Sequence, residues 1–134
     1  MLLRPYLFLD GRTEEALEFY KASLGAEVMT LTRFNDSPPD THSNLAPDSG
    51  EKIMHAALRI GDSTILFSDG SPGTEFKGFS LALTPSNAAE AERVFAALPD
   101  GGAIQVPLAK TFFAPLFGWV TDRFGLSWMI ALEP

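Results

Sequence analysis

The sequence predicts an α+β fold in which one strand–helix–strand–strand–strand pattern occurs twice. Short apolar runs bounded by turn residues alternate with only two segments of helical periodicity. The order of elements is the same in both halves, although the letters differ, and a polar, glycine-rich stretch separates the halves. Repeated units of about 60 residues indicate two modules packed together.

The first half supplies one helix and four strands. Residues 13–24 carry apolar side chains at helical spacing, with Thr13 as the expected N-cap and Gly25 as the C′ residue. Gly61-Asp62 predicts a hairpin turn between the last two strands. The expected strands span residues 2–9, 27–34, 53–60 and 63–68.

The second half repeats this order. Asn87 is the expected N-cap of its helix, with Glu90 as the capping-box partner. The expected strands span residues 76–83, 103–108, 113–121 and 127–132. We therefore expect one domain over residues 1–134, composed of a first module over 1–69, a hinge over 70–75 and a second module over 76–134.

Composition and charge exclude several classes of function. The chain of 134 residues has 46% hydrophobic and 20% charged residues, which is typical of a globular domain. The absence of cysteine excludes disulfides, thiolate metal sites and cysteine nucleophiles. A net charge of −7 argues against nucleic-acid binding. With neither a signal-peptide pattern nor an apolar run of about 20 residues, we expect a cytoplasmic protein without membrane segments.

Several segments, in order along the chain, carry a family resemblance. They are LEFYKASLGA (17–26), HAALRIGD (55–62), LFSD (66–69), Thr111-Phe112, Phe117-Gly118 and TDRFGLSWMI (121–130). Together they resemble the PhnB-like branch of the vicinal-oxygen-chelate (glyoxalase/bleomycin-resistance) superfamily, a branch also labelled 3-demethylubiquinone-9 3-methyltransferase-like. The chain departs from this pattern at Phe113-Ala114, where the branch has Trp-Gly.

The resemblance implies two βαβββ modules whose strands form a cupped mixed sheet, with the helices on its convex side. It also implies a homodimer and a pocket for a small-molecule ligand in the cup. Metal-dependent members hold the metal with His, Glu or Gln on the inner face of four strands. By motif spacing, the corresponding positions here fall near Pro5, Leu66 or Ser68, Ser80 and Met129.

Strand alternation predicts which side chains face the cup. We expect Tyr6 and Phe8 to face the helices, leaving Pro5 and Leu7 for the cup, and Phe79 to belong to the apolar face of its strand. Pro, Leu and Met side chains are not ligands for a hard divalent metal, and a serine hydroxyl is a poor one. We therefore expect neither a catalytic metal nor another cofactor.

Two polar residues of strand 53–60 share a face and are candidates for the pocket. His55 can serve as an acid or base, or donate a hydrogen bond to a ligand. The alternative is a histidine whose ring is satisfied by a neighbouring group. Arg59 can bind an anion with two parallel hydrogen bonds. Its alternative is a salt bridge at the surface or at a dimer edge.

Four aromatic residues gather near the end of the chain: Phe112, Phe113, Phe117 and Trp119. They can wall an apolar pocket or stack on a flat ligand, but we expect at least two of them to be ordinary core. Asp69 and Asp122 are predicted to stabilise turns rather than to act in catalysis. The long loop 35–51 contains His42 near several aspartates. We interpret these residues as polar side chains exposed to solvent rather than as a metal site.

Two functions are consistent with these features. The first is metal-independent binding of a small molecule in a cup lined by His55, Arg59, Ser80, Phe113, Trp119 and Met129. The second is an enzyme that uses His55 as acid or base, or an atypical metal held by His55 and loop carboxylates. The chain lacks a G-x-G-x-x-G turn after its first strand and a ribose-binding acidic residue, features that a nucleotide-dependent methyltransferase usually has.

Overall fold

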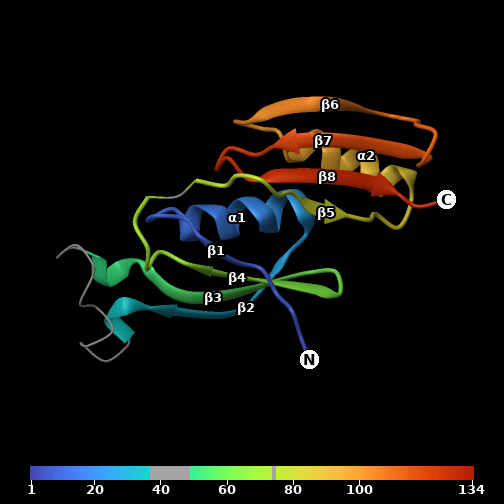
Figure 1. Ribbon diagram of the computed structural model, residues 1–134. Helices are drawn as coiled ribbons and strands as arrows, with labels where there is room; N and C mark the ends of the chain where they lie inside the picture. Colours follow the sequence, from blue (N-terminus) through green and yellow to red (C-terminus); the bar gives the residue numbers. More distant parts are fainter. Residues whose placement is uncertain (37–48, 74) are drawn as a thin grey trace. The chain divides into compact units, whose positions relative to one another are not determined.

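A computed structural model describes residues 1–36, 49–73 and 75–134. His42, with the loop carboxylates Asp40 and Asp48, lies outside these ranges. The chain divides into two compact units, Met1–Thr74 and Glu75–Pro134, each with a four-stranded mixed sheet (Figure 1). None of the helices that the structure describes is long and apolar enough to cross a membrane.

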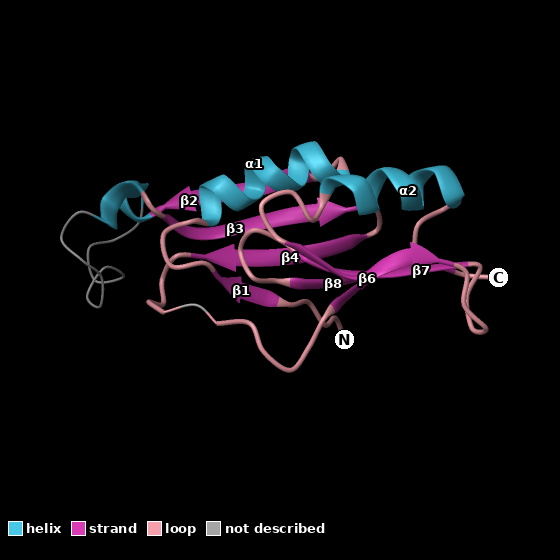
Figure 2. Cartoon of the chain, turned by 90° about the horizontal axis from the view of Figure 1, so that it is seen from above, coloured by secondary structure: helices cyan, strands magenta, loops and turns pink. Residues whose placement is uncertain are grey.

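In the described part of the first unit, one α-helix lies on one face of the sheet (Figure 2). Its elements are β1 (Tyr6–Phe8), α1 (Thr13–Leu24), β2 (Glu27–Arg33), β3 (Ile53–Ile60) and β4 (Ser63–Ser68), with short 3-10 helices η1 (Phe34–Asp36) and η3 (Ser49–Glu51). The strand order is β1-β4-β3-β2, with β1 and β4 parallel and the other pairs antiparallel. The predicted helix and the two strands of the hairpin at Gly61 are confirmed, whereas the first strand is shorter than expected.

Alternating side chains give each sheet a helix face, which packs on its helix, and an opposite open face. In the first unit, Leu7, Leu58 and Phe67 are buried on the helix face. The ring of Tyr20 on α1 lies 6.2 Å from that of Phe67. Apolar burial against α1 therefore sets the register of the sheet, because a slip of one residue would turn these side chains to the open face.

The start of α1 differs from the expectation. Thr13 is not the N-cap but the first helical residue, and the N-cap position, Arg12, makes no side-chain capping bond. Asp69, at the end of β4, takes that role instead and accepts hydrogen bonds from the backbone and hydroxyl of Thr13. Gly25 ends the helix in the left-handed conformation, with φ 66°, as predicted.

The second unit repeats the architecture of the first. Its elements are β5 (Leu81–Leu83), α2 (Ala88–Ala97), β6 (Ala103–Ala109), β7 (Leu116–Thr121) and β8 (Ser127–Leu132). The strand order β5-β8-β7-β6, with β5 and β8 parallel, matches that of the first unit. The predicted cap is confirmed, because the Asn87 side chain accepts a hydrogen bond of 2.9 Å from the Glu90 backbone.

Candidate functional site

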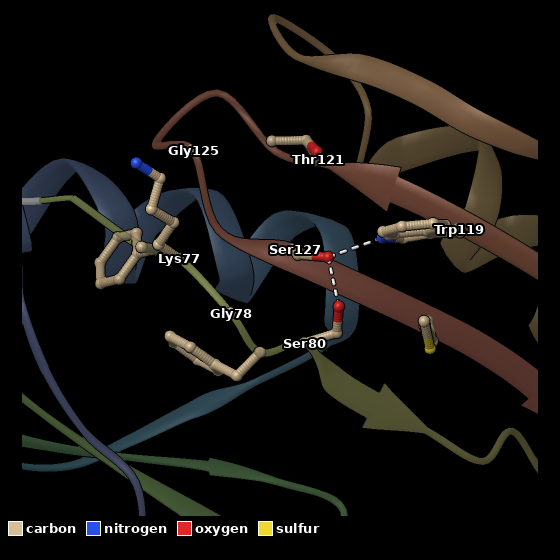
Figure 3. A pocket seen from close by; sticks show the side chains of 10 residues that line it. Lys77, Gly78, Ser80, Trp119, Thr121, Gly125 and Ser127 are labelled. Atoms are coloured by element: carbon tan, nitrogen blue, oxygen red, sulfur yellow. Dashed lines mark hydrogen bonds between the residues drawn. The ribbon is translucent and has the colours of Figure 1, made fainter.

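The second unit has a pocket of about 660 Å³ on the open face of β7 and β8, beside the segment that leads into β5 (Figure 3). This volume is in the range of roughly 300–1,000 Å³ that small-molecule sites occupy. All the lining residues belong to this unit, and they come from residues 76–80, from the two strands β7 and β8, and from the turn between those strands. The pocket is therefore formed within a single module.

Apolar side chains form most of one wall. The rings of Phe76 and Phe79 pack edge to face with centroids 6.3 Å apart, and Trp119 and Met129 extend the apolar surface. Gly78, between the two phenylalanines, has φ 79°, a conformation that favours glycine. This bend breaks strand alternation, so the expectation for Phe79 is wrong: it lines the pocket and is 45% exposed.

Hydroxyl groups form the polar part of the pocket. Trp119 donates its indole N–H to Ser127 Oγ at 2.6 Å, and the hydroxyls of Ser127 and Ser80 are hydrogen-bonded to each other (Figure 3). Thr121 also lines the pocket, and its hydroxyl accepts a bond of 3.2 Å from the Gln105 amide. The site thus combines several aromatic side chains with a short chain of hydroxyls.

The β7–β8 turn is held by a buried carboxylate. Asp122 Oδ1 accepts the backbone N–H groups of Phe124 at 2.9 Å and Leu126 at 3.1 Å. Its Oδ2 accepts the indole N–H of Trp128 at 2.8 Å. The predicted turn role of Asp122 is confirmed. The turn leads into Ser127, the first residue of β8, which lines the pocket.

The open face of the first unit carries a second polar and aromatic group. The Tyr6 hydroxyl lies 3.0 Å from His55 Nδ1, and the Tyr6 ring stacks on Phe8 with centroids 5.2 Å apart. Burial raises the pKa of Tyr6, and a hydrogen bond with Ser68 partly offsets this. The expectation that Tyr6 and Phe8 face the helix is therefore wrong, because Leu7 occupies the helix face.

Arg59 forms an ion pair with Glu27, the residue opposite it on β2. The two side chains are 49% and 61% exposed, so this pair contributes little to stability. The alternative of a surface salt bridge is thus the arrangement that the structure shows, and anion binding by Arg59 stays a prediction.

The structure brings together three of the predicted ligand-binding residues, Ser80, Trp119 and Met129. Phe113 does not line this pocket, is 52% exposed and contacts the rings of Phe112 and Phe117. All four clustered aromatics are at least partly exposed, so the expectation that two of them are core is wrong.

Sequence reasoning missed the wall formed by residues 76–79. Its signal was the pair Lys77-Gly78, which interrupts the apolar run that predicted a strand over 76–83. A glycine inside a strand pattern often marks a bulge or bend, and here it turns two phenylalanines into the pocket.

The side chains at the open face do not fit a divalent metal. Among the residues that the structure describes, no three His, Cys, Asp or Glu side chains group so that they could hold one. The pocket offers serine hydroxyls and a methionine thioether, and the first unit offers a phenol beside a single imidazole. Hydroxyls and thioethers are poor ligands for Zn²⁺ and for the hard cations, which favour imidazole, thiolate or carboxylate.

Two modules with the same strand order and one helix each define the glyoxalase/bleomycin-resistance fold, with a candidate small-molecule pocket on one open face. Residues 2–131 match the model of a family described as 3-demethylubiquinone-9 3-methyltransferase. The chain belongs to this family, and the resemblance to PhnB-like proteins is confirmed.

The chain is similar to several other bacterial proteins over nearly its whole length. It is 35% identical to protein YjdN of Escherichia coli (strain K12), over 97% of this chain and 94% of that protein. Protein PA1353 of Pseudomonas aeruginosa has a crystal structure with TM-score 0.85 and 39% identity, covering 99% and 98% of the two chains. A PhnB protein from Bacillus cereus has TM-score 0.80 and 26% identity, covering 99% and 100%.

Proposed function

We propose that this protein binds a flat, largely apolar small molecule in the pocket of its second unit, without a metal. The observation that supports this most is that the aromatic side chains of Phe76, Phe79 and Trp119 line the same pocket as the hydroxyls of Ser80 and Ser127. Binding sites for small molecules commonly combine aromatic walls with a few polar groups that fix the orientation of the ligand. A ligand that covers these exposed rings removes apolar surface from water.

Methyl transfer is the activity in the family description, and the chain gives it little support. A nucleotide-binding fold carries a glycine-rich turn after its first strand, with the cofactor at the end of a parallel sheet. After β1 this chain has Asp10-Gly11-Arg12-Thr13, with one glycine, and each described sheet has only one parallel strand pair. Binding of a small molecule therefore explains the geometry better than methyl transfer does.

Tryptophan fluorescence tests the proposed function. We expect a library of aromatic compounds to contain ligands that change the emission of Trp119 saturably, because its indole lies at the pocket. The change should persist after treatment with EDTA and disappear in Trp119→Phe, in which buried Trp128 still emits. Absence of any saturable ligand, or a signal that EDTA abolishes and added divalent metal restores, would contradict the proposal.

Acid–base catalysis by His55 is a second candidate, and one contact favours it. When the Tyr6 phenol donates to His55 Nδ1, the remaining ring hydrogen lies on Nε2, so the phenol fixes the tautomer of the imidazole. Tyr6 would then be a positioning residue and His55 the proton-transfer group.

A homodimer, implied by the family resemblance, remains a further proposal.

Hydrogen–deuterium exchange tests this candidate without a known substrate. In D₂O, we expect the protein to accelerate exchange of the methyl hydrogens of aromatic methyl ketones, followed by NMR. His55→Ala should abolish the acceleration while leaving the melting temperature nearly intact, and Tyr6→Phe should change the pH profile of the rate. Exchange that is unaffected by His55→Ala excludes the catalytic role.

A further inference from the structure

The hydroxyl chain in the pocket has one more hydrogen than its internal hydrogen bonds use. Three groups carry hydrogens: the Trp119 indole N–H and the hydroxyls of Ser127 and Ser80. Two hydrogen bonds join them, Trp119 to Ser127 and Ser127 to Ser80. Whichever serine donates in the second bond, one hydroxyl hydrogen is left over.

The direction of the chain indicates where this spare hydrogen lies. An indole N–H can only donate, so Ser127 Oγ already accepts one bond. A hydroxyl that accepts a hydrogen bond becomes a better donor, and chains that run head to tail strengthen each link. This order favours Ser127 as the donor to Ser80, which leaves the Ser80 hydrogen available to the pocket that Ser80 lines.

We propose that the pocket selects aromatic molecules that carry a hydrogen-bond acceptor oxygen, such as a carbonyl or carboxylate, and that Ser80 is the residue that recognises this oxygen. This inference rests on the proposed function of the same pocket. A ligand without the oxygen would leave the Ser80 hydrogen without a partner once water is excluded, and a buried unpaired donor is unfavourable. Ser80 thus acts as the specificity determinant and the aromatic wall as the general binding surface.

Lys77 offers a way to distinguish neutral from anionic oxygens. Its ammonium group lies 3.2 Å from the Glu75 carboxylate, and both side chains are largely exposed. Exposed ion pairs of this kind are weak, so Lys77 can exchange Glu75 for a ligand carboxylate. A carboxylate ligand would therefore depend on Lys77, whereas a neutral ketone would not.

A matched pair of probes tests the inference. We expect 2-acetylnaphthalene to bind more tightly than 2-ethylnaphthalene by roughly 3- to 10-fold in ligand-observed NMR, which is the fold-change expected for one net hydrogen bond. Ser80→Ala should reduce this ratio, because the hydroxyl that faces the ligand oxygen is lost and the spare hydrogen moves to Ser127, at a different point of the same pocket. Thr30→Val, which removes an exposed hydroxyl on β2 of the first unit, away from the residues that line the pocket, should leave the ratio unchanged. Binding of 2-naphthoate that Lys77→Met weakens would identify the carboxylate as the preferred oxygen.

The outcomes separate this inference from the proposed function. Equal affinity of the ketone and the hydrocarbon would overturn the role of Ser80 while leaving the pocket as a binding site. Binding of neither compound, nor of 2-naphthoate, would count against the pocket itself. A ketone preference that survives Ser80→Ala would overturn the assignment of Ser80, and its loss in Thr121→Val would assign recognition to that other hydroxyl of the pocket.

Discussion

Asp122→Ala is expected to reduce the free energy of unfolding by about 3–5 kcal/mol, measured by urea denaturation. Asp122 is 2% exposed, and its carboxylate accepts hydrogen bonds from two backbone N–H groups of the turn and from the Trp128 indole. Alanine removes the acceptor of these bonds, in a site too enclosed for full hydration. The Trp128 side chain, 1% exposed, cannot turn its N–H to water without disrupting the core.

Asp62→Ala is the matched control for this prediction. Asp62 occupies the β3–β4 turn of the first unit, the counterpart of the β7–β8 turn, and it is exposed. Substitution there should change stability by no more than about 0.5 kcal/mol. If Asp122→Ala were as mild as Asp62→Ala, the buried carboxylate would not be what holds the turn.

The fold was predictable because local signals and apolar burial agree along most of the chain. Residues 13–24 have apolar side chains at helical spacing, and a glycine in the left-handed conformation ends the helix. The hairpin strands 53–60 and 63–68 are separated by the predicted turn residues, Gly61-Asp62. In the same way, the turn before Ser127 sets the residue at which β8 begins. Repetition of the same order of elements in the second half then identified the two modules.

The composition of the open faces was less predictable, because the first strand of each module is short and apolar on both sides. In β1, Tyr6, Leu7 and Phe8 are all apolar or aromatic, so alternation alone does not say which side packs on α1. The structure resolves this through a polar contact, because only the open face lets the Tyr6 hydroxyl meet His55. Contacts between residues 49 positions apart leave no trace in local periodicity.

Both modules nevertheless use their open faces in a similar way. In the first, a ring nitrogen of His55 on β3 meets the hydroxyl of Tyr6 on β1. In the second, the ring nitrogen of Trp119 on β7 reaches Ser80, next to β5, through the hydroxyl of Ser127. The same architecture therefore carries an ionisable pair in one module and a neutral donor chain in the other, and the two proposed functions rest on this difference.

Asp69→Ala is expected to lower the free energy of unfolding by about 3–5 kcal/mol. Its carboxylate, 7% exposed, joins three segments that are far apart in sequence. Oδ1 accepts from the Gly11 backbone at 2.9 Å and from the backbone and hydroxyl of Thr13 at 3.1 and 2.6 Å. Oδ2 accepts from the Ile53 backbone at 2.9 Å, so the loss of one side chain loosens the start of both α1 and β3.

Thr13→Val is a milder test of the same site. It removes one of the four hydrogen bonds to Asp69 and keeps the shape of the Thr13 side chain. We expect it to cost about 1–2 kcal/mol in the same urea measurement, well below Asp69→Ala. The Asp69 carboxylate also interacts favourably with the helix dipole at the N-terminus of α1, and Thr13→Val leaves that interaction in place. Equal losses for the two variants would mean that the Thr13 hydroxyl alone anchors α1, and that the bonds to Gly11 and Ile53 add nothing.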